Sequence, residues 1–151
     1  MRRLPPWERL KEIASQRCDA QARKLSAATR ERDDARRRLD TLESYRSDYQ
    51  ARLAEASHRG IDLEALRNYQ AFLSQLERAI GQQKEILACA ERSVVGATAQ
   101  WLGERRRMQS FQTLDTRQLA AHARDEARRE QGLTDEWAAR SAAQSVPDTD
   151  S

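Results

Sequence analysis

The sequence has few residues that interrupt helices. Only three of its 151 residues are proline, and none lies between Trp7 and Val146. Aromatic residues account for 5 % of the chain and charged residues for 34 %. A chain so poor in helix breakers and aromatics, and so rich in Ala, Glu, Gln, Arg and Leu, is typical of long helices rather than of a globular core. We therefore expect most buried apolar surface to lie along one narrow seam.

Further absences exclude several functional classes. Two cysteines, Cys18 and Cys89, do not make a disulfide framework, and no third ligand type sits at metal-binding spacing. No apolar run approaches the ~20 residues that cross a bilayer, and the basic N-terminus lacks the apolar core of a signal peptide, so we expect the cytoplasm. No nucleophile elbow, phosphate loop or paired histidine occurs, and we expect no enzyme, cofactor or metal.

The net charge is modest. The chain carries 27 basic and 24 acidic residues, a formal charge of +3. The triplets 36–38 and 105–107 are all arginine, which raises a nucleic-acid interpretation. Acids flank both triplets and no aromatic stacking platform accompanies them, so a solvated helix surface is favoured and no nucleic-acid partner is expected.

A heptad repeat organises the second half of the chain. Every seventh residue from Leu66 to Met108 is apolar. Three residues further on, a second stripe begins at Tyr69 and is apolar except at Gln83 and Glu104. A 3-4 repeat sustained for about six heptads predicts a coiled coil. The helix cannot bury this seam alone and needs a partner.

The first half of the chain supplies that partner. Residues 7–57 form a helix with a weaker seam, in which small alanines predominate and Arg32 and Arg46 intrude. Residues 58–62 form the turn, where Gly60 frees the backbone and Asp62 can cap the next helix. A connection this short makes the helices antiparallel, with facing residues whose numbers add up to roughly 119.

The second helix is expected to outrun the first. It covers about 63–143, and the first helix runs out opposite Gln112, so 113–143 has no partner within the hairpin. Gly132 is a candidate break, with Thr134 a possible cap for a restarted helix. Residues 144–151 are expected to be disordered. The predicted fold is all-α: one domain, a long antiparallel two-helix coiled-coil hairpin with an overhanging C-terminal helix segment.

Two surfaces are candidates for partner binding. Near the turn, Tyr45 and Phe72 should lie side by side on the flank of the hairpin, where a broad exposed patch indicates a partner site. The alternative is that these rings fold over a thin seam of alanines. The patch consists of Leu42, Tyr45, Tyr49, Phe72, Leu76 and Ala79.

The far end, where both termini and the overhang meet, is the second candidate. An unpaired amphipathic helix either binds a partner or frays, and both remain open here. The apolar residues at this end are Leu10, Ile13, Phe111 and Leu114, with Trp137 beyond them. Outward glycines at 81, 96 and 103 mark a bend, a close partner approach or mere drift.

A motif across the turn resembles a known family. The stretch from Asn68 to Gln82 is similar to the NYQxFhxxLExAI stretch of FliJ-type flagellar export proteins. The resemblance also covers residues at matching distances on either side: Leu42, Tyr45, Tyr49, Gly60, Ile61, Trp101, Phe111, Gln112, Thr113, Leu114, Arg117 and Gln118.

This resemblance implies a function and partners. It implies a cytoplasmic central-stalk protein of the bacterial type III flagellar export apparatus, peripheral to the inner membrane. One end of the rod would engage the pore of the hexameric flagellar export ATPase, and the rod would contact the cytoplasmic domain of the export-gate membrane protein and escort export chaperones. The turn-end patch corresponds to the gate contact and the far end to the ATPase contact. The alternative is a generic coiled-coil scaffold that dimerises through its seam and overhang.

Overall fold

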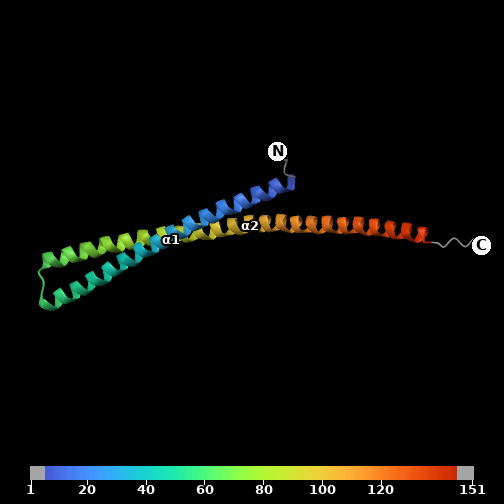
Figure 1. Ribbon diagram of the computed structural model, residues 1–151. Helices are drawn as coiled ribbons and strands as arrows, with labels where there is room; N and C mark the ends of the chain where they lie inside the picture. Colours follow the sequence, from blue (N-terminus) through green and yellow to red (C-terminus); the bar gives the residue numbers. More distant parts are fainter. Residues whose placement is uncertain (1–5, 146–151) are drawn as a thin grey trace, which may run out of the picture.

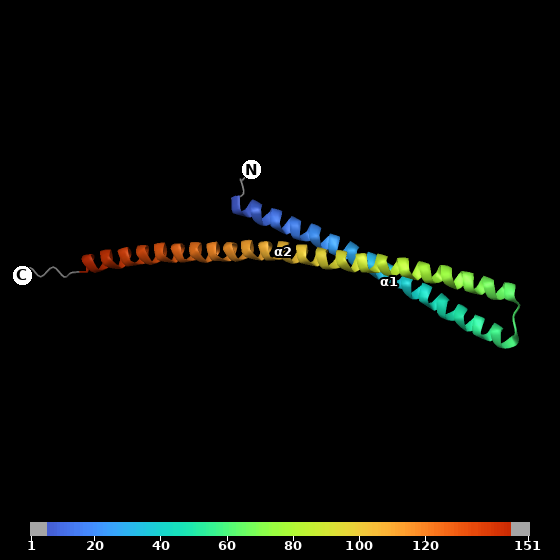
Figure 2. The same cartoon turned by 180° about the vertical axis from the view of Figure 1, so that it is seen from behind.

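Two long helices make up the part of the chain that the computed structural model describes, residues 6–145. Helix α1 spans Pro6–Arg59, 54 residues, and α2 spans Leu63–Gln144, 82 residues. In Figure 1, α1 passes across α2 near the middle of the pair, and α2 then runs on alone beyond the start of α1. Figure 2 shows the same hairpin from behind. The predicted antiparallel coiled-coil hairpin with a C-terminal overhang is confirmed. The predicted disordered tail lies, beyond Ser145, outside the described residues.

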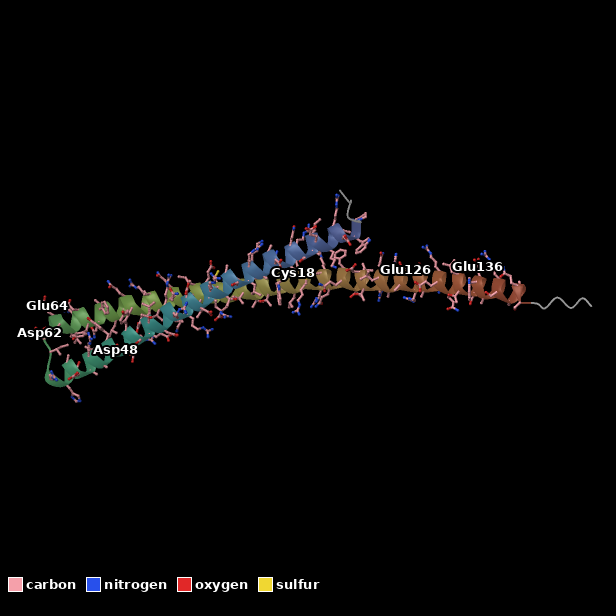
Figure 3. All side chains as sticks on the ribbon, in the orientation of Figure 1. Cys18, Asp48, Asp62, Glu64, Glu126 and Glu136 are labelled. Atoms are coloured by element: carbon pink, nitrogen blue, oxygen red, sulfur yellow. The ribbon has the colours of Figure 1, made fainter. Side chains whose placement is uncertain are left out.

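The turn forms as its residues dictate. Gly60 has a φ of +83°, a left-handed conformation that side-chain-bearing residues rarely adopt. The backbone N–H of Gly60 donates to the carbonyl of Ser57 at 3.4 Å. Asp62 then caps α2, with its Oδ1 accepting from the N–H of Ala65 at 2.7 Å. Figure 3 places Asp62 at this end of the rod.

The buried residues form a narrow line along the interface of the two helices and not a compact core. The most buried residue of this line is Ile80, 2 % exposed, and Ala14, Cys18, Ala35, Leu39 and Leu76 complete its buried apolar positions. All six lie in the predicted heptad stripes, which confirms that periodicity set the packing. Contacts across the seam follow the predicted register, because Gln83 reaches Ala35 and Tyr49 packs against Tyr69.

Gly132, a candidate break in the sequence, does not interrupt α2. The helix continues to Gln144, and the Thr134 hydroxyl donates to the Glu130 carbonyl at 2.9 Å, as a residue inside a helix does. A single glycine costs a helix only about 1 kcal/mol relative to alanine. The flanking residues favour helix strongly enough to carry it through that position.

Candidate partner-binding surfaces

The two flanks of the hairpin differ in chemistry. One flank carries the ion pair between Arg36 Nη2 and Glu91 Oε1, at 3.3 Å. Away from the turn, heptad steps from this pair meet polar, charged or alanine residues, and we call this side the polar flank. Its members on both helices are Ser15, Ala22, Thr29, Arg36, Glu43, Glu77, Lys84, Glu91, Thr98 and Arg105.

The opposite side, which we call the groove flank, is where large apolar side chains are exposed. Its members lie one residue before a seam residue on each helix: Leu10, Arg17, Lys24, Glu31, Arg38 and Tyr45 on α1, and Phe72, Ala79, Ile86, Ser93, Gln100, Arg107 and Leu114 on α2. Five of these are large hydrophobic residues exposed to solvent: Leu10, Tyr45, Phe72, Ile86 and Leu114. The groove flank therefore carries more exposed large apolar side chains than the polar flank.

At the turn end, the predicted patch is partly surface and partly core. The Tyr49 ring lies 4.3 Å from that of Phe72 and 5.1 Å from that of Tyr69, measured between centroids. Tyr45 is 58 % exposed and Phe72 is 41 % exposed. The ring contact of Phe72 is thus with Tyr49, where the sequence indicated Tyr45. Tyr45 offers the larger free aromatic surface.

The remaining members of the patch lie deeper. Leu76 is only 8 % exposed and belongs to the seam, while Leu42 and Ala79 are half-buried. Within the patch, Tyr49 packs on the rings of Tyr69 and Phe72 while Tyr45 stands free. A partner at this end would meet Tyr45 and the edge of Phe72.

The far end contains a groove with a volume of about 390 Å³. Leu10, Ile13 and Phe111 line it together with Ala14, Arg17, Glu104, Arg107 and Ser110. The Nζ of Lys11 bonds to Oδ2 of Asp115 at 2.6 Å and ties the start of α1 to α2. Leu114 is exposed beside this end. The structure therefore brings four of the five predicted far-end residues into one neighbourhood.

The overhang begins after Asp115. Every residue from 116 to 145 is exposed, so about 30 residues, or about 45 Å of helix, pack against nothing in the described chain. Figure 3 shows Glu126 and Glu136 on this solitary part of α2. Trp137, 72 % exposed, lies about 35 Å along the helix from Leu114 and is a separate surface.

Sequence reasoning missed a second groove in the middle of the rod. It has a volume of 410 Å³ and is lined by Ile86, Cys89 and Gln83 with Glu31, Asp34, Ala35, Arg38, Ala90 and Ser93. The missed signal was the heptad position of Ile86, which is that of Phe72 two heptads later. Gln83 is buried, and its Nε2 donates to the Ala35 carbonyl at 3.0 Å.

Other features of the described residues point to no chemistry. Among residues 6–145 no group of three or more His, Cys, Asp or Glu side chains is placed to hold a metal. His122 is exposed and 3.5 Å from Glu126 Oε1. Cys18 is buried and Cys89 exposed, and both are free thiols. Neither described helix is apolar enough along its length to cross a membrane.

Comparisons with known proteins identify relatives of similar length. The family model described as "Flagellar FliJ protein" matches residues 4–146. Two curated relatives with that same name are similar to the chain. The one from Salmonella typhi is 35 % identical over 135 residues, covering 89 % of this chain and 92 % of its own. The one from Escherichia coli strain K12 is 33 % identical over 133 residues, covering 88 % and 90 %.

A solved structure shares the fold. It is a Chlamydia trachomatis protein described as a YscO homologue, with a TM-score of 0.66 and 20 % sequence identity. The match covers 95 % of this chain and 97 % of that one. At this identity the likeness supports the long helical hairpin as a shared architecture.

Proposed function

Since the chain belongs to the FliJ family of flagellar proteins, we propose that it is a non-enzymatic stalk and adaptor of the flagellar type III protein export apparatus. In this role the rod engages the hexameric export ATPase and the cytoplasmic domain of the export-gate membrane protein, and escorts export chaperones. The protein is then peripheral at the cytoplasmic face of the inner membrane.

One observation carries this proposal: exposed apolar surfaces lie at both ends of a stiff paired rod. Tyr45 and Leu10 are 35 residues apart on one continuous helix, which places them roughly 53 Å apart. Helix α1 has no proline or glycine between these two residues, so no kink is expected between the ends. Such a rod can hold two partners at a fixed separation, which is what a stalk requires.

The two ends suit different partners. The far end combines the groove at Leu10, Ile13 and Phe111 with a solitary helix that has a slim cross-section. A single helix about 10–12 Å wide can enter the central pore of a ring, where a broad globular domain cannot. We assign this end, with Leu114 and Trp137, to the ATPase, and the turn-end patch around Tyr45 to the gate.

A capture experiment tests the assignment. The full chain and a chain ending at Gln112 are compared for binding to purified hexameric export ATPase and, separately, to the gate's cytoplasmic domain. We expect the shortened chain to lose binding to the ATPase and to retain binding to the cytoplasmic domain of the gate. Tyr45→Ala should give the reverse pattern. Loss of both partners in either variant, or of neither, would refute the division of the rod into two ends.

Oligomeric state separates this proposal from the alternative scaffold. A stalk predicts that sedimentation of the free chain gives a monomer at micromolar concentration. A stable dimer that disappears when residues 113–151 are removed would favour the scaffold, because the overhang would then pair with a second copy.

A further inference from the structure

The two grooves of the rod are equivalent in position. The mid-rod groove has its α1 wall at Glu31, Asp34, Ala35 and Arg38, and the far-end groove has its α1 wall at Leu10, Ile13, Ala14 and Arg17. Each of these residues is displaced from its counterpart by three heptads, and the α2 walls match in the same way. Both grooves therefore open on the groove flank, about 31 Å apart along the rod.

Between the two grooves, α2 presents only small side chains at one heptad position. Cys89, Gly96, Gly103 and Ser110 follow one another at heptad spacing. A Cβ atom built at Gly96 or Gly103 would meet nothing within 4 Å. No large side chain of α2 at this position therefore blocks a path from one groove to the other.

The stretch between the grooves is cationic. Lys24 lies between the grooves, Arg17 and Arg107 line the near edge of the far-end groove, and all three are exposed. Neither Arg17 nor Lys24 has an acidic residue three or four positions away on α1, and neither forms an ion pair with any residue the structure describes. Arg107 has only a long contact, 3.8 Å, with Glu104. These charges are available to an acidic partner.

We propose that the groove flank between Ile86 and Leu10 is a docking surface for one acidic amphipathic helix of a partner protein. The helix lies along the flank as a third strand of the coiled coil. Its apolar side chains enter the two grooves, three heptads apart, and its carboxylates face Arg17, Lys24 and Arg107. Burial of the exposed Ile86 and Leu10 side chains drives the docking, and the charges select the partner.

Acidic residues of the flank are compatible with this occupant. Asp34 is bonded to Arg37 on its own helix. Glu104 reaches the far-end groove from the seam, with its side chain 19 % exposed and 3.8 Å from Arg107. Glu31 is the remaining acid, and it belongs to the mid-rod groove together with Arg38. The partner's acids therefore extend from Lys24 to the near edge of the far-end groove, and its apolar residues enter both grooves.

This inference goes beyond the proposed function, because it places a binding surface along the rod and not at its ends. The probe is a synthetic amphipathic peptide of about 30 residues with leucine and isoleucine at heptad positions and glutamate on both sides of them. A sister peptide has lysine in place of every glutamate. Binding to the full-length chain is followed by fluorescence anisotropy at several salt concentrations. We expect the glutamate peptide to bind at least about tenfold more tightly than the lysine peptide. This difference in affinity should shrink as salt screens the charges.

Two matched variants locate the site. The double variant Arg17→Glu with Lys24→Glu should bind the glutamate peptide about tenfold or more weakly. Arg23→Glu with Arg30→Glu makes the same change of net charge on the same helix, away from the groove flank, and should leave binding nearly unchanged. Ile86→Ser should weaken binding of both peptides, whereas Val95→Ser, at an exposed position away from the groove flank, should not. Melting curves of all four variants check that the hairpin is intact.

Three outcomes would overturn the proposal. The first is equal binding of the two peptides, and the second is an equal effect of the two double charge reversals. The third is dimerisation of the free chain that Ile86→Ser abolishes, since the occupant would then be a second copy. Capture of the ATPase by the Lys24→Glu variant is a separate readout, so failure of this inference and failure of the stalk assignment are distinguishable.

Discussion

Replacing Gln83 with leucine asks what the one buried polar side chain at the middle of the seam contributes. Gln83 is 8 % exposed at a position that is apolar in most other heptads. Its amide donates to the carbonyl of Ala35 at 3.0 Å. That carbonyl lies inside α1 and already accepts the helical bond from Leu39 four residues on. The substitution therefore removes a hydrogen bond without leaving the Ala35 oxygen unpaired.

The expected effect is a gain in stability. Burying a leucine side chain contributes about 1.5–3 kcal/mol, and the lost hydrogen bond removes about 1 kcal/mol. The net gain is about 1 kcal/mol, which raises Tm by roughly 2–4 °C for a chain of this size. Loss of the polar pair should also relax the register, because a single polar contact in an apolar seam favours one alignment over its neighbours.

Urea unfolding followed by circular dichroism measures this gain, with Gln82→Leu as the matched control. Gln82 is the preceding residue on α2 and is exposed, so its replacement should change the free energy of unfolding by less than about 0.5 kcal/mol. Sedimentation of the Gln83→Leu variant checks that it has kept its oligomeric state. If Gln83→Leu lowered stability while Gln82→Leu did not, the hydrogen bond would outweigh apolar burial and the reasoning would be wrong.

Three further predictions concern the turn end and the overhang. Tyr45→Ala should change the free energy of unfolding by less than about 0.5 kcal/mol because the ring is mostly exposed, whereas Phe72→Ala should cost about 1–2 kcal/mol because its ring packs on Tyr49; equal costs in urea unfolding would contradict this. Asp62→Ala should cost about 1 kcal/mol by removing the cap on Ala65, with the exposed, unbonded Asp48→Ala as the control in the same thermal melts. Gly132→Ala should strengthen the overhang by about 0.5–1 kcal/mol, seen as slower amide exchange near that residue, and unchanged exchange would argue against the continuous helix.

The heptad pattern was sufficient to predict the hairpin and its register. Leu39, Leu76 and Ile80 are buried where the stripes place them, because the 3-4 repeat puts the apolar residues on one face and the short turn at Gly60 sets the register. The cap at Asp62 also followed from local chemistry, since the first N–H groups of a helix need acceptors. These are properties of adjacent residues or of a strict period.

Depth within the coiled coil was harder to predict. A period fixes the direction of a side chain about the helix axis, but whether that side chain is covered depends on the residues opposite. Tyr49 and Tyr45 differ for this reason, because Tyr49 meets Tyr69 and Phe72 while Tyr45 meets no ring among the described residues. The mid-rod groove was not predicted because its α1 side consists of small and polar residues, which add no large apolar residue to the heptad pattern. Only Ile86 on α2 marked its position.

The shared flank constrains how partners can approach the rod. The turn-end residue Tyr45 and the far-end residue Leu10 occupy the same heptad position on α1, so both lie on the groove flank. A flank of a left-handed coiled coil winds about the axis with a pitch of about 150 Å. Over the roughly 53 Å between these residues, it turns through about a third of a revolution. Partners at the two ends therefore approach from directions about 120° apart, and a helix that follows the flank between them must wind with the hairpin. Inserting one heptad into each helix would move the two ends apart by ~10 Å and rotate them by only ~25°, whereas a four-residue insertion would move one surface off the flank altogether.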